Sequence, residues 1–197
     1  MDTSSSPAPG AVGLIGLGEI GQVHAAAIRR SSAGHLVAVA DTVPELRGPF
    51  EAQGIRGYRD ARELIADAEV GTVSVCLPHY LHFPVALEAI RAGKHVLVEK
   101  PMTISVAEGH QLVDAAAAAG VALGVSHNQV FYAAHAEAKR LIDTGAIGRP
   151  VLIRLRLGMG PLFGDWRDSP RPGRRWPLGR RRRAPALLGP ALVRSGA

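Results

Sequence analysis

The chain has 197 residues, of which 47% are hydrophobic and 5% aromatic. This length suits one domain of about 150 residues and part of another, which excludes two complete domains of that size. No apolar run approaches the roughly 20 residues of a membrane span, and the first ten residues lack the basic and apolar regions of a signal peptide. We therefore expect a disordered leader at 1–10 and a cytoplasmic protein. The single cysteine, Cys76, fits a reducing compartment and a buried strand position.

The net charge of +6 is unevenly distributed along the chain. Residues 1–168 hold 15 Lys and Arg against 17 Asp and Glu, a balance of −2. Residues 169–197 hold eight arginines and no acidic residue, a balance of +8. The body is therefore mildly acidic, and all the excess basicity belongs to the tail.

Short apolar runs alternate with helical patterns from residue 11 to residue 125, which is typical of βαβ units around a parallel sheet. The pattern predicts strands at 11–18, 35–41, 70–78, 94–101 and 121–127. It predicts helices near 20–32, 44–53, 60–67, 80–92 and 104–119. Gly93 and Gly120 stand where two of these helices need a left-handed residue before the next strand. We expect an α/β fold with a doubly wound parallel sheet, a Rossmann domain over 11–125.

The pattern changes after this domain. Residues 133–148 indicate a helix ended by Gly145. Residues 150–159, PVLIRLRLGM, then alternate between an apolar face and a partly charged face, which predicts the first strand of a separate, mainly antiparallel sheet. We interpret 126–168 as a junction and the first strand of an α+β second domain, of which only a remnant is present.

Three glycines follow the first predicted strand in a G-x-G-x-x-G pattern: Gly16, Gly18 and Gly21. The first permits a tight turn, the second lets the backbone approach a pyrophosphate, and the third lets the helix pack closely on the strand. The helix start, which includes Glu19 and Ile20, offers unpaired N–H groups to phosphates.

Asp41 ends the second predicted strand, twenty residues after Gly21. An acid there can accept hydrogen bonds from the ribose hydroxyls of adenosine and would repel a 2′-phosphate. This pattern predicts dinucleotide binding and favours NAD over NADP.

A second group of polar residues follows the third and fourth buried strands. Pro78 precedes His79 and His82, and the triplet Glu99-Lys100-Pro101 ends the next strand at the same edge of the sheet. A partly desolvated lysine at this edge can act as acid or base on a substrate hydroxyl, or hold that hydroxyl by hydrogen bonding. The alternative is an exposed Lys100 paired with Glu99.

The segments GLGEIGQVH, VAVAD, LPHYLH, AGKHVLVEKPMT and LIDTGAIGRPVLIRL, in this order, closely resemble the Gfo/Idh/MocA oxidoreductases. The resemblance covers about residues 11–168. It implies an NAD(P)-dependent dehydrogenase that transfers a hydride between the nicotinamide and a hydroxyl of a sugar, cyclitol or similar polyol. It implies that Lys100 is the catalytic lysine and that Pro78, His82 and Glu99 surround the nicotinamide half of the cofactor. His79 stands where the family often has Asn.

The segment 126–135, SHNQVFYAAH, is similar to the stretch that lines the family's active site. We expect Asn128 and Gln129 to contact substrate; alternatively they cap or brace the following helix. Many relatives have an arginine where this chain has Val130, so no binding arginine is assigned. His127 and His135 are interpreted as structural. We expect no metal site and no hydrolase triad.

The tail GRRWPLGRRRRAP, residues 173–185, departs from the family, in which a glycine-rich loop and an Asp-x-x-x-His helix start follow. We interpret 169–197 as an out-of-frame, disordered segment. The alternative, a nucleic-acid-binding arm, is disfavoured because the tail has one aromatic residue and no recognised binding fold.

We accordingly expect a truncated chain that binds NAD but turns over polyols poorly. The alternative is a non-catalytic NAD-binding protein. Intact relatives form homo-oligomers largely through the second domain, so oligomerisation of this chain is doubtful.

Overall fold

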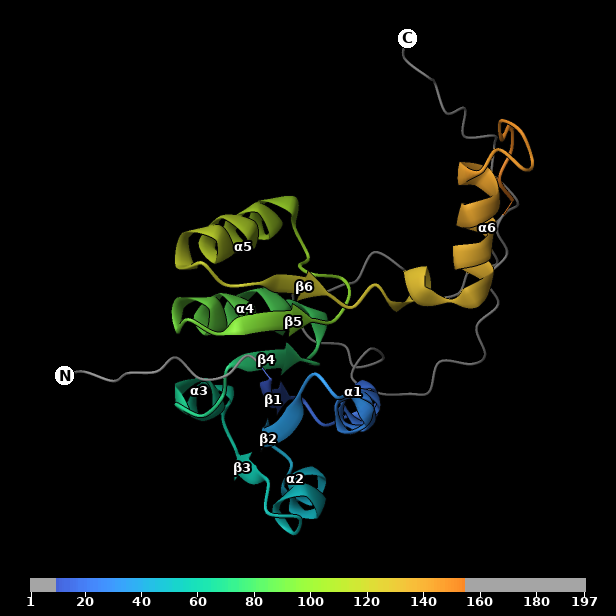
Figure 1. The fold of residues 1–197 in the computed structure, drawn as a ribbon. Helices are drawn as coiled ribbons and strands as arrows, with labels where there is room; N and C mark the ends of the chain where they lie inside the picture. Colours follow the sequence, from blue (N-terminus) through green and yellow to red (C-terminus); the bar gives the residue numbers. More distant parts are fainter. Residues whose placement is uncertain (1–9, 155–197) are drawn as a thin grey trace, which may run out of the picture. The chain divides into compact units, whose positions relative to one another are not determined.

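The structure, a computed structural model, describes residues 10–154. Six strands form one sheet in the order β3-β2-β1-β4-β5-β6, and every neighbouring pair is parallel (Figure 1). The strands are β1 (Ala11–Ile15), β2 (His35–Ala40), β3 (Arg56–Tyr58), β4 (Thr72–Val75), β5 (His95–Val98) and β6 (Leu123–Val125). The chain reverses its direction of winding between β1 and β4, which confirms the predicted doubly wound Rossmann sheet.

Helices connect successive strands, and two further helical segments follow the last strand. They are α1 (Glu19–Arg30), α2 (Pro44–Glu51), α3 (Ala61–Ala66), the 3₁₀ turn η1 (His79–Leu81), α4 (His82–Arg91), α5 (Val106–Ala119), the 3₁₀ turn η2 (Asn128–Phe131) and α6 (Ala133–Asp143). The local sequence determines where several of these helices begin or end. Asp60 caps α3 in a capping box with Glu63, and Ser105 caps α5. Gly93 and Gly120 adopt φ of 73° and 66°, as predicted.

The helices cover the two faces of the sheet in two groups (Figure 1). On one face, α3, α4 and α5 contribute Leu64, Ile90 and Leu112, whose side chains are completely buried in the larger core. On the other face, α1 and α2 contribute Ala25 and Phe50 to a second core. Burying one such large apolar side chain contributes about 1.5–3 kcal/mol. Both faces of the central strands are thereby covered, which explains their continuous apolar sequence.

One strand of the sheet was not predicted. β3 has three residues with Gly57 in the middle, so it contains no apolar run that would indicate a strand in the sequence. Its pairing with β2, from Ala38 opposite Arg56 to Ala40 opposite Tyr58, holds it in the sheet. The strand therefore forms through its neighbour rather than through its own propensity.

The strand predicted at 150–159 is not formed over its described residues, 150–154. Residues 150–154 have no strand assignment, and Val151 and Ile153 are 89% and 73% exposed. A strand needs a partner for its backbone groups, and no strand of residues 10–154 pairs with this segment. The remainder of that predicted strand, the leader 1–9 and the arginine-rich tail lie outside the described residues.

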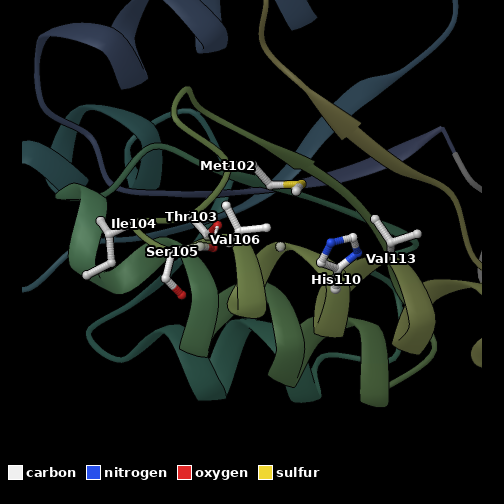
Figure 2. A pocket seen from close by; sticks show the side chains of 8 residues that line it. Met102, Thr103, Ile104, Ser105, Val106, His110 and Val113 are labelled. Carbon is white, nitrogen blue, oxygen red and sulfur yellow. Dashed lines mark hydrogen bonds between the residues drawn. The ribbon is translucent and has the colours of Figure 1, made fainter.

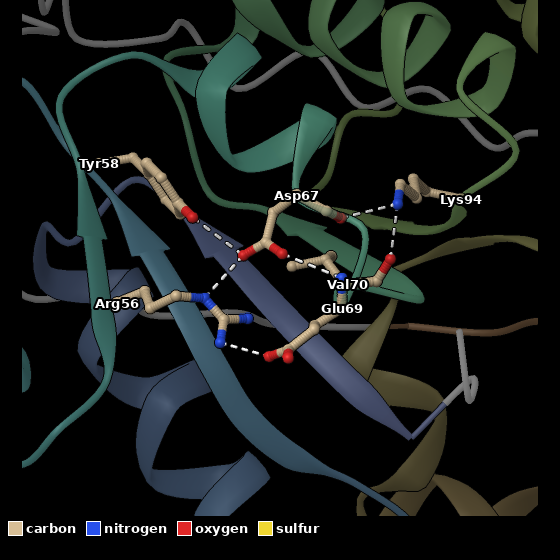
Figure 3. A network of polar contacts seen from close by, with 6 residues as sticks. All are labelled: Arg56, Tyr58, Asp67, Glu69, Val70 and Lys94. Atoms are coloured by element: carbon tan, nitrogen blue, oxygen red, sulfur yellow. Dashed lines mark hydrogen bonds and ion pairs between the residues drawn. The ribbon is translucent and has the colours of Figure 1, made fainter. Parts of the chain in front are cut away.

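A polar network ties the loop between α3 and β4 to β3, at the edge where β4 and β5 begin (Figure 3). The Asp67 carboxylate accepts hydrogen bonds from Glu69 N–H (2.9 Å), Arg56 Nε (2.8 Å) and the Tyr58 hydroxyl (3.0 Å). Arg56 also pairs with the Glu69 carboxylate. Burial opposes ionisation of Asp67, but these hydrogen bonds outweigh it and lower the pKa of the carboxyl.

Lys94 closes the same loop from the start of β5. Its side chain is buried, and Nζ donates to the carbonyl oxygens of Asp67 (2.9 Å) and Val70 (2.7 Å). Desolvation lowers the pKa of Lys94, although the nearby Asp67 charge acts in the opposite direction. These contacts tie both carbonyl groups of the loop to the start of β5.

Asp67→Asn is expected to lower the free energy of unfolding by about 2 kcal/mol at pH 7, because hydrogen bonds to a charged acceptor are lost. Because the folded-state pKa of Asp67 lies below the value of 3.8 for an unstructured chain, its stabilisation is present above that pH and is lost as the pH falls through the folded value. Urea unfolding between pH 3 and pH 7 measures this, with the exposed Asp114→Asn as control. An equal loss at both pH values would contradict the assignment.

Candidate functional site

The turn between β1 and α1 brings three backbone segments into close contact. Gly16 has φ of 89°, and its N–H donates to Ala40 O at 2.8 Å. A Cβ on Gly16 would overlap the carbonyl oxygen of Cys76, and a Cβ on Gly21 would overlap the carbonyl oxygen of Gly16. Only glycine fits either position. Gly18, by contrast, faces open space.

The start of α1 is free of a side-chain cap. Gly18 is the N-cap residue and provides no side chain, so no side-chain cap accepts from the first N–H groups of the helix, at Glu19, Ile20 and Gly21, and the space beside Gly18 is open. A helix N-terminus of this kind carries a partial positive charge and favours a phosphate. These residues therefore fit the role predicted for them in holding a diphosphate.

Asp41 follows β2 at the same edge of the sheet. Its Oδ2 accepts from Leu17 N–H at 2.8 Å and its Oδ1 accepts from Val43 N–H at 2.9 Å. The two bonds fix the carboxylate beside the glycine turn. A carboxylate has about four acceptor sites, so both oxygens can still accept from ribose hydroxyls.

His82 lies inside the protein rather than on a surface. It is fully buried, with Nδ1 2.7 Å from Pro101 O and Nε2 2.7 Å from Leu77 O. Both partners are acceptors, so both contacts are hydrogen bonds only when the ring carries two protons. His82 thus connects the loops after β4 and β5, while Pro78 precedes η1 in that first loop. Its predicted contact with the nicotinamide stays a prediction.

Glu99 is buried and does not pair with the Lys100 side chain. Among the described residues, its Oε1 lies 3.1 Å from His24 Nε2 and its Oε2 accepts from the Lys100 backbone N–H at 3.1 Å. The alternative prediction of a Lys100–Glu99 ion pair is therefore wrong for this geometry. The partner, His24, was missed at the sequence level. Its spacing of three residues from Gly21 would have placed it on the helix face toward the sheet.

Lys100 lines a pocket of about 360 Å³ together with four residues of the segment after β6: His127, Asn128, Gln129 and Val130. The structure thus brings together the lysine and the two amide residues that were predicted to contact substrate. Neither Asn128 nor Gln129 caps α6, because the N-cap residue is Tyr132 and makes no side-chain cap bond. The alternative that they brace this helix stays open, since the Gln129 carbonyl accepts from Tyr132 N–H at 3.2 Å.

Two histidines near this pocket differ in their surroundings. His135 Nδ1 lies 2.7 Å from Gln129 O, and its ring stacks on Tyr132, so it is structural as predicted. His127 is exposed at the pocket wall. It is the second titratable side chain there, beside Lys100.

A larger pocket, of about 430 Å³, lies over the start of α5 and contains none of the predicted site residues (Figure 2). Mostly apolar side chains line it, namely Met102, Thr103, Ile104, Ser105, Val106, His110 and Val113, together with Gly109. Polar side chains make up a smaller share of its lining than at Lys100, where four of the five lining residues are polar and could recognise a hydroxyl compound. The smaller pocket at Lys100 is the better candidate.

Two other kinds of site find no support in residues 10–154. No group of three or more His, Cys, Asp or Glu side chains could hold a metal ion there. Ser74, His24 and Glu99 do form a chain of hydrogen bonds, but Ser74 is only 2% exposed and no substrate can reach its hydroxyl. Burial raises the pKa of Cys76 to about 12, which keeps its thiol unreactive. No helix in this part of the chain is long and apolar enough to cross a bilayer.

The parallel sheet, the glycine turn leading into an uncapped helix and the acid after β2 define a dinucleotide-binding Rossmann domain. Residues 11–127 match the model of the Gfo/Idh/MocA oxidoreductase family, NAD-binding Rossmann fold, and the chain belongs to this family. The matched part is the NAD-binding domain of the family.

Similar proteins share about half their length with this chain. It is 35% identical over 159 residues to 1,5-anhydro-D-fructose reductase of Ensifer adhaerens, covering 79% of this chain and 48% of the relative. It is 32% identical over 146 residues to myo-inositol 2-dehydrogenase of Thermotoga maritima, covering 73% and 44%. The crystal structure of the WlbA dehydrogenase from Bordetella pertussis with NADH and UDP-GlcNAcA superposes with a TM-score of 0.67 at 32% identity, covering 71% and 43%.

Gly21→Ala is expected to destabilise the fold, whereas Gly18→Ala is expected to leave it intact. The added methyl at Gly21 meets a backbone carbonyl that cannot move away, and such overpacking typically costs about 1–3 kcal/mol. Thermal unfolding of the two variants beside the wild type measures the difference. Equal melting temperatures for both variants would contradict the close approach at Gly21.

Proposed function

We propose that this chain binds NAD and takes part in hydride transfer between the nicotinamide and a hydroxyl-bearing carbon of a sugar, cyclitol or similar polyol. The observation that carries the proposal is the meeting of Lys100 with Asn128 and Gln129 in one pocket. The glycine turn and Lys100 both follow strands whose carboxyl ends lie at one edge of the sheet, where ligands of open α/β sheets bind. The names of the relatives, a sugar reductase and an inositol dehydrogenase, support this substrate class.

The described residues fit a dinucleotide. The open space at Gly18 and the uncapped start of α1 suit the diphosphate, and the fixed Asp41 carboxylate suits the ribose of adenosine. A 2′-phosphate would meet the negative charge of Asp41 at close range, which favours NAD over NADP. When bound, NAD supplies the acceptor for the hydride of the substrate carbon.

Lys100 has the chemistry to manage the hydroxyl proton. Its side chain is exposed at the pocket, and Nζ has no hydrogen-bond partner among the residues that the structure describes. A neutral amine can take the hydroxyl proton as the carbon loses its hydride, and an ammonium can return it in reduction. The amides of Asn128 and Gln129 both donate and accept, which suits the neighbouring hydroxyls of a polyol.

A second function, binding of NAD without appreciable turnover, is favoured by the exposure of the pocket. All five residues that line it are exposed, so this part of the chain does not exclude water from the reacting groups. We therefore propose that the 197-residue chain by itself turns over polyols slowly. The two functions share the cofactor site and differ in whether a polyol binds at Lys100.

Asp41→Ser is expected to weaken NADH binding about tenfold and to improve NADPH binding, because the ribose acceptor and the repelling charge are both lost. Fluorescence titration with each nucleotide gives the dissociation constants. Gly18→Ala is the matched non-binding variant, since its methyl enters the space assigned to the diphosphate. Asp114→Ser controls for the change of net charge, and an unchanged preference in Asp41→Ser would contradict the assignment of Asp41.

Lys100→Met is expected to raise the NADH dissociation constant less than tenfold and to weaken binding of a polyol to the NADH complex at least about tenfold. Calorimetric titration of myo-inositol into the NADH complex measures the second effect. A separate mixture of myo-inositol and NAD⁺, in which the polyol can give up a hydride, is followed at the NADH absorbance band for turnover. Lys139→Met, a surface lysine of α6, is the control. A wild-type chain that binds NADH but no polyol would support the non-catalytic function instead.

A further inference from the structure

Three polar side chains meet next to the backbone of Lys100, on the face of the sheet that α1 covers. His24 comes from α1, Ser74 from β4 and Glu99 from the end of β5. His24 Nδ1 lies 2.9 Å from Ser74 Oγ, and His24 Nε2 lies 3.1 Å from Glu99 Oε1. Only 12% and 11% of the His24 and Glu99 side chains are exposed. The ring is therefore held by one side chain from β4 and one from the end of β5.

Glu99 connects this cluster to the backbone of Lys100. While one carboxylate oxygen contacts His24, the other accepts the Lys100 N–H at 3.1 Å. Helix α1 is thereby linked through His24 and Glu99 to the residue assigned to the hydroxyl proton. No arginine or lysine side chain of the described residues bonds to Glu99, so His24 is its principal side-chain partner.

Two further side chains, Ser126 and Cys76, lie near the cluster. Ser126 Oγ lies 3.5 Å from His24 Nε2, and Cys76 Sγ lies 4.0 Å from Ser74 Oγ. The buried Cys76 thiol stays protonated at neutral pH. The orientation of the ring is thus set by Ser74 on one side and by Glu99 on the other.

The cluster is too deeply buried for chemistry of its own. Ser74 and Glu99 are 2% and 8% exposed, so neither reaches a substrate directly. Burying such polar groups costs desolvation that an apolar cluster would avoid. What the cluster provides is a fixed connection between two elements of the site.

We propose that His24 is a positioning residue for Lys100, acting through Glu99, and that it links the seating of a dinucleotide on α1 to the orientation of Lys100. This inference rests on the proposed function, because it takes NAD as the ligand of α1 and Lys100 as the residue that acts on the hydroxyl. His24 lies three residues, less than one helical turn, beyond Gly21. A ligand that fixes the start of α1 therefore also fixes the His24 side of the link.

The test uses the small number of lysines in the chain. Lys94, Lys100 and Lys139 are the only three, so the full chain labelled with ¹⁵N-lysine gives three backbone amide signals. Lys100→Arg assigns the signal of Lys100 by its disappearance. Hydrogen exchange of this amide is measured without cofactor, and its chemical shift is then followed on addition of NADH.

We expect His24→Asn to speed exchange of the Lys100 amide at least about tenfold and to reduce its response to NADH. The shorter side chain still reaches Ser74 but not Glu99. His24→Gln retains a donor that reaches Glu99, and it is expected to restore slow exchange. The Lys94 amide, which donates to Ala89 O at 3.0 Å, reports any general loss of stability and is expected to be unchanged.

His110→Ala, at an exposed histidine of α5, is the matched control. Equal exchange of the Lys100 amide in His24→Asn and wild type would overturn the inference, and so would equal exchange in the Asn and Gln variants. The exchange measurement needs no cofactor. A wild-type chain that fails to bind NADH would therefore contradict the proposed function, while faster exchange in His24→Asn would still support the link from His24 to Lys100.

Discussion

The close approach of α1 to the central strands is the constraint on which the rest of the site depends. Gly21 lies against the Gly16 carbonyl, and Gly16 lies against the Cys76 carbonyl, with no room for a methyl group at either glycine. This contact seats the helix start beside Asp41 and brings His24 within reach of Ser74 and Glu99. Without it, the positive end of the helix and the buried histidine would both stand away from the sheet.

The sheet and most of its helices could be predicted because the buried strands are continuous apolar runs and helix ends such as Ser105 and Gly120 have local signals. β3 could not, because its pairing with β2 forms it. The strand at 150–159 was predicted from alternation alone, and over its described residues no partner strand is present. The clustering of Lys100 with Asn128 was predicted, although only from a family resemblance.

Contacts between residues from different parts of the chain were harder to predict from the sequence than the positions of the site residues themselves. Glu99 follows Val98 directly and precedes Lys100, so sequence suggested a pair between the two charged neighbours. The fold instead directs the carboxylate toward α1 and leaves the ammonium at the pocket. The contact of His82 with the nicotinamide stays a prediction, whereas the two backbone carbonyls that its ring nitrogens face were not apparent from the sequence. Contacts of this kind join residues that are far apart in the chain, so the order of the residues does not identify them.

The structural network and the candidate site lie at opposite edges of the sheet. The edge at which β4 and β5 begin is tied by Asp67 and Lys94, and no residue of the candidate site belongs to that network (Figure 3). Loops at the opposite edge can therefore change in sequence without loosening it. A designer who grafts a new substrate loop after β6 would keep the Asp67 and Lys94 contacts as an independent foundation, and a lineage diversifying its substrates would have the same freedom.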